Sequence, residues 1–190
     1  MTEALRDLPH RVVYTPDSDL PARFSPAREA RAVYVKSHVG AFRCFTGHQL
    51  ALAAPRAEHI LVLEDDATPN RGDWMAVVEC GRRLLGTFEV VSLHGRDAGG
   101  VERVVDCGES RFLVLAPTTR RRMFYRATLK YIQGSLAYLI TAGAAGRFVG
   151  LEYRGVPVDH LLANAFTFAV AAESPFDHDR RHGSLVERPR

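Results

Sequence analysis

The chain has 190 residues, of which 46% are hydrophobic and 25% charged, and its formal net charge is +3. This length predicts one domain over residues 1–190 with a sizeable core, and the apolar fraction excludes an intrinsically disordered chain. No apolar run approaches the roughly 18 residues of a membrane-spanning helix, and residues 1–11 hold no apolar signal core. We therefore expect a cytoplasmic protein without a transmembrane segment, with peripheral attachment to the inner membrane as an alternative. The oligomeric state is open.

Strand-like and helix-like segments alternate in the first half of the chain. Ser25 and Pro26 are typical of a helix start, because serine caps backbone N–H groups and proline fits the first helical turn. The predicted elements are a strand over 11–14, helices over 25–32 and 42–54, a strand over 60–63 and a helix capped by Asp73 that runs to about 85. This alternation is typical of an α/β fold with a mainly parallel sheet covered on both faces.

The second half is predicted to hold more strands. Gly108 marks the turn of a hairpin between 101–105 and 111–115, and Thr141 is the predicted cap of a helix rich in small residues. The other predicted elements are strands over 88–93, 136–140 and 166–171, a loop over 117–122 and a helix over 142–149. From about residue 174 the chain is polar and arginine-rich, which predicts a partly ordered tail or lid.

Three carboxylates, Glu64, Asp65 and Asp66, follow the aliphatic run over 60–63. Four aliphatic residues in succession predict a strand buried on both faces. Adjacent carboxylates repel each other, and a hard divalent cation such as Mg²⁺ or Mn²⁺ is the simplest way to neutralise them. Ligands of open α/β sheets bind at the carboxyl ends of strands. The pattern therefore indicates a metal and phosphate site, with a plain strand end and turn as the alternative.

Cysteine and arginine usage adds two further indications. The three cysteines, Cys44, Cys80 and Cys107, are odd in number and fit no metal-ligand spacing, which predicts reduced thiols. Arginine dominates the basic residues, and 120–122 with Arg126 form the densest cluster. The planar guanidinium can donate two hydrogen bonds to phosphate, so one interpretation is that this cluster faces an anionic partner. The alternative is that the cluster lies in a solvated loop.

Three segments resemble, in order, the motifs of family 25 glycosyltransferases, which build bacterial lipopolysaccharide sugars. Residues 40–48 are similar to the family's Gly-x-x-x-Cys-x-x-Ser-His stretch, and 61–66 to its Val-Leu-Glu-Asp-Asp signature. Residues 134–141 and 156–159 are similar to its Gly-x-x-Ala-Tyr-Leu-Ile-Ser and Pro-Val-Asp block. An ordered set of motifs is more specific than any one of them.

The resemblance implies a GT-A fold, a three-layer α/β/α sandwich that binds a nucleoside diphosphate sugar. It also implies that the acidic motif holds Mn²⁺ or Mg²⁺ against the two phosphates of this donor. A metal ion suits the chemistry, because sugar transfer expels a nucleoside diphosphate whose developing charge needs a Lewis acid. The implied reaction moves a hexose to a hydroxyl acceptor with inversion. The acceptor could be a saccharide, a small molecule or a modified nucleic acid.

The metal ligands implied by the resemblance are Glu64, Asp66 and His178. Side chains alternate along a strand, so Glu64 and Asp66 point the same way if the extended geometry continues. GT-A enzymes often take a last ligand from a C-terminal histidine, and His178 is the candidate here, with His182 close to it in sequence. A solvated charged tail is the alternative for both histidines.

Donor binding is assigned to Thr15, Arg23, His48 and Asp65, with a satisfied core histidine as the alternative for His48. The chain departs from the family in its first strand, which lacks the usual Ile-Asn-Leu ending and arginine pair. It departs again at Gly47, which stands where the family has the serine of Ser-His.

The resemblance makes Asp159 the candidate catalytic base, because inversion requires a group that takes the proton of the acceptor hydroxyl. A plain helix cap is the alternative. Two other classes of function remain open. One is a non-catalytic nucleotide- or carbohydrate-binding domain with a degenerate glycosyltransferase fold. The other is a nucleotidyltransferase, which would usually show a glycine-rich loop after its first strand, whereas residues 15–26 contain no glycine.

Overall fold

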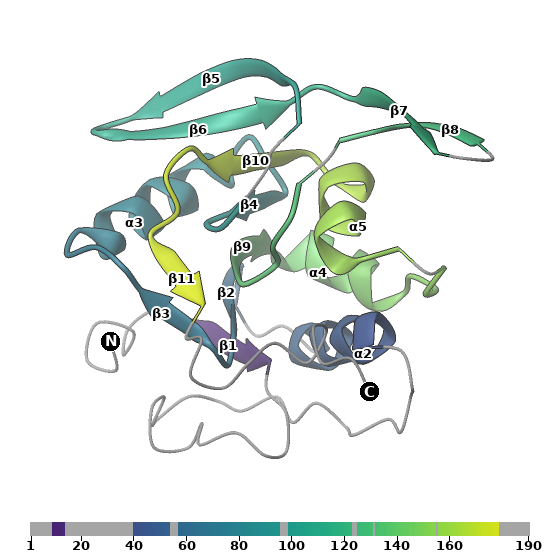
Figure 1. Cartoon of the computed structure of the whole chain (residues 1–190). Helices are drawn as coiled ribbons and strands as arrows, with labels where there is room; N and C mark the ends of the chain where they lie inside the picture. Colours follow the sequence, from purple (N-terminus) through teal and green to yellow (C-terminus); the bar gives the residue numbers. More distant parts are fainter. Residues whose placement is uncertain are drawn as a thin grey trace.

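The computed structural model describes residues 9–13, 40–53, 57–95, 99–122, 125–130, 132–154 and 156–178. These residues form the expected α/β fold, with helices on both faces of a seven-stranded sheet (Figure 1). The elements in chain order are β1 (His10–Val13), α2 (Gly40–Leu52), β2 (His59–Glu64), β3 (Ala67–Pro69), α3 (Trp74–Leu84), β4 (Val90–Ser92), β5 (Val101–Cys107), β6 (Ser110–Leu115), β7 (Thr118–Arg122), β8 (Tyr125–Leu129), β9 (Ala137–Thr141), α4 (Ala142–Val149), α5 (Val158–Ala165), β10 (Phe168–Ala171) and β11 (Phe176–His178).

The sheet is mixed, with the strand order β1-β2-β9-β4-β10-β6-β5. Its neighbouring pairs include two parallel ones, β1–β2 and β4–β10, and four antiparallel ones. The expected mainly parallel sheet is therefore not confirmed. Strand β9 lies between β2 and β4 and runs antiparallel to both. The chain reaches β9 directly after the β7–β8 hairpin and not through a helical crossover, which a parallel neighbour would require.

Strand β2 is buried on both faces, as the aliphatic run predicts. Leu61 and Leu63 pack into the core beneath α3, whereas Ile60 and Val62 pack into the core beneath α2, α4 and α5. None of these four side chains is more than 2% exposed. Because β1 and β9 flank β2, the strand is internal, and the three carboxylates follow its carboxyl end.

Two local signals act as the sequence predicts. The Thr141 hydroxyl accepts a hydrogen bond from the Ala144 amide at 3.2 Å and so caps α4. Gly108 adopts a φ of 61° in the β5–β6 turn, where residues with a Cβ atom are strained. Asp73 differs from expectation. It lies at the N-cap of α3 without a capping bond, because its carboxylate binds Arg71 instead, at 2.7 Å.

Two other segments correct the sequence prediction. Residues 118–122, expected in a loop, form β7 and pair with β8. Residues 176–178, expected in a tail or lid, form β11 and pair with β3. Phe176 fixes β11, because its buried ring lies 5.6 Å from the ring of Trp74. These pairings depend on packing and not on local propensity, so no periodic pattern revealed them.

The predicted helix over 25–32 and the end of the chain from residue 179 lie outside the described residues. Within the described ranges, no helix has both the length and the hydropathy needed to cross a bilayer.

Candidate functional site at the carboxyl end of strand β2

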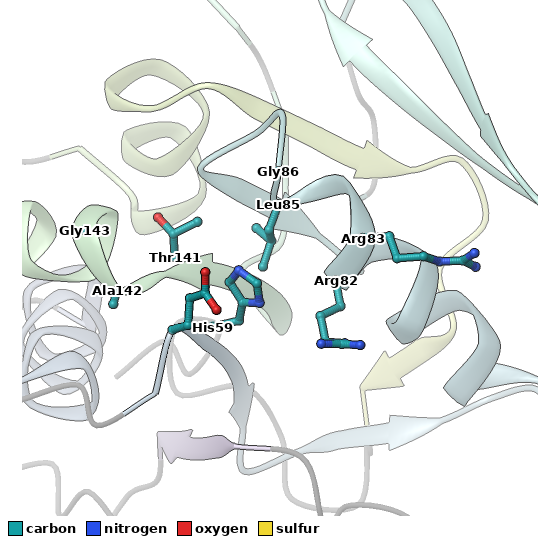
Figure 2. Close-up of a pocket in the computed structure, with 9 residues that line it drawn as sticks. His59, Arg82, Arg83, Leu85, Gly86, Thr141, Ala142 and Gly143 are labelled. Atoms are coloured by element: carbon teal, nitrogen blue, oxygen red, sulfur yellow. The ribbon is translucent and has the colours of Figure 1, made fainter.

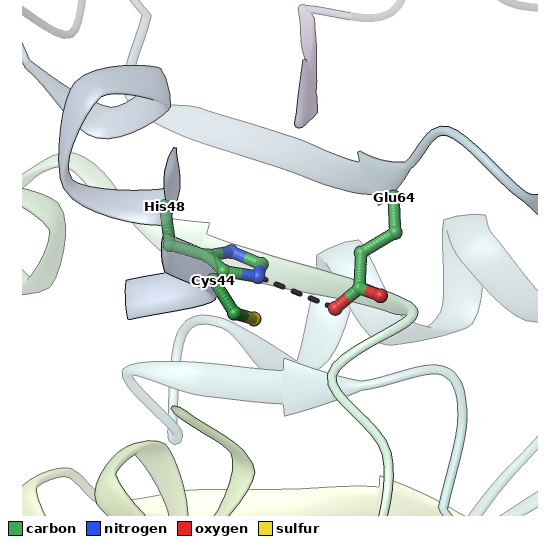
Figure 3. Close-up of side chains that lie close together, drawn as sticks. All are labelled: Cys44, His48 and Glu64. Carbon is green, nitrogen blue, oxygen red and sulfur yellow. Dashed lines mark hydrogen bonds and ion pairs between the residues drawn. The ribbon is translucent and has the colours of Figure 1, made fainter. Parts of the chain in front are cut away.

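Glu64 is the last residue of β2, and its carboxylate points toward helix α2 (Figure 3). Its Oε1 accepts a hydrogen bond from the Ser135 hydroxyl at 2.6 Å and lies 3.3 Å from His48 Nε2. Burial by itself raises the pKa of Glu64, but hydrogen bonds from His48 and Ser135, with the charges of His48 and His178, lower the pKa below its ordinary value. Glu64 is therefore a carboxylate at neutral pH.

His48 lies on α2 and is fully buried, with 0% of it exposed. Its Nδ1 lies 2.9 Å from the Tyr138 hydroxyl, on the central strand β9. Burial raises the pKa of Tyr138 well above its ordinary value, so the hydroxyl keeps its proton. In a neutral imidazole, Nε2–H then donates to Glu64 and Nδ1 accepts from Tyr138. The environment is that of a satisfied core histidine that orients Glu64.

Cys44 lies one helical turn before His48 on the same face of α2. One ligand atom each from Cys44, His48 and Glu64 lie within 4.8 Å of one another. Burial, and then the charge of Glu64, raise the pKa of the Cys44 thiol well above its ordinary value. Cys44 thus belongs to a group that could hold a metal ion, which the sequence analysis did not predict, and the three cysteines are free thiols as expected. The signal for this group was the i,i+4 relation of Cys44 to His48 on a predicted helix.

Asp66 and His178 are neighbours, although 112 residues separate them in sequence. His178 Nδ1 lies 2.9 Å from Asp66 Oδ2, because β11 pairs with β3 and sets His178 opposite Ala67. Both side chains reach solvent, with 21% of Asp66 and 32% of His178 exposed. Asp65 lies between Glu64 and Asp66 in the turn that leaves β2 and is partly exposed.

His94 is a buried residue of this region that the sequence analysis missed. Its Nδ1 lies 2.9 Å from the Ser174 hydroxyl and 3.0 Å from the Phe176 carbonyl oxygen. Its ring stands nearly perpendicular to the ring of His178, with 5.2 Å between centroids. His94 therefore fixes the segment that carries His178. No sequence signal identified it, because it follows a strand with no motif around it.

Asp159 lies in the first turn of α5, one residue after the start of the helix, so it is not the N-cap. Its Oδ2 accepts a hydrogen bond from the Gly134 amide and its Oδ1 one from the His160 amide, each at 2.8 Å. Gly134 has a φ of 113° and packs against His94. Asp159 thus holds the turn whose next residue, Ser135, donates to Glu64.

These contacts join all three segments that carry the resemblance, the third of which contains both 134–141 and 156–159. His48 belongs to residues 40–48, and Glu64 belongs to residues 61–66. Both are within hydrogen-bonding distance of side chains from residues 134–141: His48 of Tyr138, and Glu64 of Ser135. His48 and Glu64 are also within this distance of each other. Asp159 belongs to 156–159 and reaches the same turn through Gly134.

The remaining candidates lie elsewhere or outside the described residues. Thr15, Arg23 and His182 are not among the described residues. The arginines at 120–122 and 126 lie on the β7–β8 hairpin, where only the backbone is described.

A cavity of about 470 Å³ lies at the opposite end of β2 (Figure 2). His59, at the start of β2, Arg82 and Arg83 of α3 and the first residues of α4 line it. A strand rises about 3.3 Å per residue, which places this cavity roughly 17 Å along β2 from Glu64. The cavity and the Glu64 cluster therefore lie at opposite ends of the strand.

Comparison with models of known protein families gives no match, and a search of curated proteins returns no relative of this chain. The family 25 resemblance therefore stays a prediction, and the function must be argued from the site.

Proposed function

We propose that this chain is a metal-dependent glycosyltransferase with a GT-A-like fold, which moves a hexose from a nucleoside diphosphate sugar to a hydroxyl acceptor. The observation that carries the proposal is the contact of Asp66 with His178, at 2.9 Å, beside Glu64 at the end of an internal strand. The resemblance implies an acidic metal-binding motif, and GT-A enzymes often add a late histidine to it. The three segments that carry the resemblance also meet through hydrogen bonds.

Asp66 and His178 suit Mn²⁺, because they offer a carboxylate oxygen and an imidazole nitrogen side by side, within reach of solvent. Mg²⁺, which prefers oxygen ligands, would be held through the carboxylates. Glu64 adds a second negative charge next to them. A bound ion would stabilise the charge that develops on the departing nucleoside diphosphate. The chain contributes the positioning, because His94 and the β3–β11 pairing hold His178 beside Asp66.

Asp159 is the proposed base that takes the proton of the acceptor hydroxyl. Two backbone amides fix the orientation of its carboxylate. Each carboxylate oxygen has a further lone pair, so an acceptor hydroxyl can still donate to it.

A non-catalytic nucleotide-binding domain is the second candidate, and one observation favours it. Both oxygens of Asp159 already serve to anchor the turn at Gly134 and the first turn of α5. In such a domain Asp159 would have only a structural role. The domain would bind a nucleoside diphosphate with its metal ion, but it would not cleave a nucleoside diphosphate sugar.

Calorimetric titration with uridine and guanosine diphosphate, with and without Mn²⁺, tests both candidates. We expect Mn²⁺-dependent binding of one diphosphate by the native chain. Asp66→Asn should weaken it roughly 100-fold or more, because asparagine keeps the shape but removes the charge that holds a hard cation. Glu58 lines the cavity at the other end of β2, and Glu58→Gln should bind the diphosphate as the native chain does. If the native chain binds neither of these diphosphates nor those of adenosine, cytidine and thymidine, with or without Mn²⁺, both candidates are wrong.

Turnover separates the two candidates. Release of nucleoside diphosphate from the matching sugar donor, with water or a panel of hydroxyl acceptors, supports a transferase. Tight Mn²⁺-dependent binding without any release supports the binding domain.

A further inference from the structure

We propose that Cys44, His48 and Glu64 form a binding site for a thiophilic divalent cation, with Zn²⁺ as the preferred ion. This site is separate from the Asp66–His178 pair that is proposed to hold Mn²⁺. The inference concerns metal binding alone and does not depend on glycosyl transfer.

The geometry of the three side chains suits one ion. Cys44 and His48 are four residues apart on α2, and both turn toward the Glu64 carboxylate on β2 (Figure 3). One ligand atom from each lies within 4.8 Å of the others. Two ligands that a tetrahedral ion holds at about 2.0–2.1 Å lie about 3.3 Å apart. The distance between His48 Nε2 and Glu64 Oε1 is 3.3 Å, so these two atoms already have the required spacing.

Charge at the site also favours a cation. Burial raises the pKa of the Cys44 thiol most, and the negative charges of Glu64, Asp159 and Asp66 raise this pKa further. The same charges attract a divalent ion, which in turn stabilises the thiolate. Binding releases one proton from the thiol. His48 would bind the ion through Nε2, so its remaining ring hydrogen would lie on Nδ1 and donate to the Tyr138 hydroxyl.

Tyr138 gives the site the support that metal-binding histidines usually have. A histidine that binds a metal through one ring nitrogen commonly hydrogen-bonds a protein group through the other, which fixes its ring. The Tyr138 hydroxyl lies 2.9 Å from His48 Nδ1, in the middle of the sheet. The ring of His48 is therefore fixed before any ion arrives.

The mixture of ligands selects the ion. One sulfur, one imidazole nitrogen and one carboxylate oxygen match the ligands of zinc, whereas Mg²⁺ and Ca²⁺ prefer oxygen alone. Glu64 is 23% exposed, so water can reach the ion from that side and complete a four-coordinate shell. Three protein ligands with one open position is the arrangement of zinc sites that bind a further small ligand.

Titration of the metal-free full chain with Co²⁺, as a spectroscopic probe, and then with Zn²⁺ tests the site. We expect a thiolate-to-cobalt charge-transfer band that Zn²⁺ removes at one equivalent. Cys44→Ser should lose the band and bind Zn²⁺ roughly 100-fold more weakly, at least as much as loss of a supporting group costs. Cys80→Ser is the matched control, since Cys80 lies on α3, and should keep the band. No band in the native chain, or an unchanged band in Cys44→Ser, would overturn the proposal.

Two further measurements keep the test decisive if Cys44→Ser folds poorly. In the native chain, Zn²⁺ should protect Cys44 from alkylation, read by peptide mass spectrometry, while Cys107 serves as an internal control. Tyr138→Phe keeps all three ligands and should weaken Zn²⁺ binding about 10- to 100-fold. Equal alkylation of Cys44 with and without Zn²⁺ would exclude the site.

Discussion

The two ends of strand β2 differ in how their polar groups are held. At the amino end, Arg82, which lines the cavity, pairs with Glu79, three residues earlier, at 2.8 Å. At the carboxyl end, Asp66 meets His178 across 112 residues and Glu64 meets Ser135 across 71. Exposed local ion pairs contribute little stability. Contacts between distant residues exist only because the whole fold holds them, which makes the carboxyl end the stronger candidate for function.

The largest expected effect is on stability, and it compares two glycines. At Gly134, with its φ of 113°, a Cβ atom would lie 2.4 Å from His94 Cδ2. Gly134→Ala should therefore lower the free energy of unfolding by about 3 kcal/mol or more, from backbone strain and overpacking together. At Gly143, which lines the amino-end cavity, the nearest atom to an added Cβ lies 3.9 Å away. Gly143→Ala should leave stability unchanged or raise it by up to about 1 kcal/mol.

Urea denaturation followed by circular dichroism measures both variants. Similar losses at the two glycines would mean that the turn at Gly134 is no more constrained than the start of α4. The structure at the carboxyl end of β2 would then be no more constrained than the structure at its amino end.

The next effect is on turnover. Asp159→Asn should slow transfer roughly 100-fold, or about 2.7 kcal/mol of barrier, because asparagine cannot take a proton. Its carbonyl oxygen can still accept the Gly134 amide, while the bond from the His160 amide is lost, so the fold and donor affinity should persist with a small loss of stability. Glu58→Gln, at the amino end, should turn over normally. Normal turnover in Asp159→Asn would assign Asp159 to a purely structural role and leave the base unidentified.

A third comparison removes one histidine from each end. His48→Ala leaves Glu64 and Tyr138 without their buried partner, which should cost about 2 kcal/mol of unfolding free energy. His59 is partly exposed at the start of β2, and His59→Ala should change stability by about 0.5 kcal/mol or less. Denaturant titration at neutral pH gives both values. A loss at His59 as large as the loss at His48 would contradict the proposed difference in how the two ends are built.

The smallest expected effects are on the free energy of unfolding at acid pH. At Glu64, burial raises the pKa, but His48 and Ser135 bring it below the ordinary value. At Glu89, near the amino end, a backbone hydrogen bond from Thr167, followed by the Arg147 bond, lowers the pKa. A lowered pKa in the fold stabilises the chain fully above the ordinary value of about 4.3, and this stability is lost as the pH falls through the folded-state pKa.

Glu64→Gln and Glu89→Gln should therefore each flatten the fall in stability below about pH 4.3. Added salt should weaken the Glu89 contribution more, because its pair with Arg147 is partly exposed. Unfolding free energies at several pH values, in low and high salt, measure this. An unchanged acid profile in Glu64→Gln would show that its carboxylate is not stabilised by its neighbours.

The sequence by itself determined the elements whose signals are local. The aliphatic run at 60–63 fixed a strand buried on both faces, Thr141 fixed the start of α4, and Gly108 fixed the β5–β6 turn. It also placed three carboxylates at the end of β2, since a strand end can be found from neighbouring residues alone. These features depend on backbone preferences and side-chain periodicity within a few residues, which any stretch of chain expresses in the same way.

Only the tertiary structure decided which distant groups meet. The antiparallel course of β9 delivers Tyr138 and Ser135 to His48 and Glu64, and the pairing of β11 with β3 delivers His178 to Asp66. Such pairings are settled by burial of residues such as Phe176 and by hydrogen bonds across the sheet, neither of which leaves a periodic mark in the sequence. The position of Cys44 is a further example of what the sequence alone does not predict. Its spacing to His48 is visible in the chain, but its approach to Glu64 exists only because α2 packs across the end of β2.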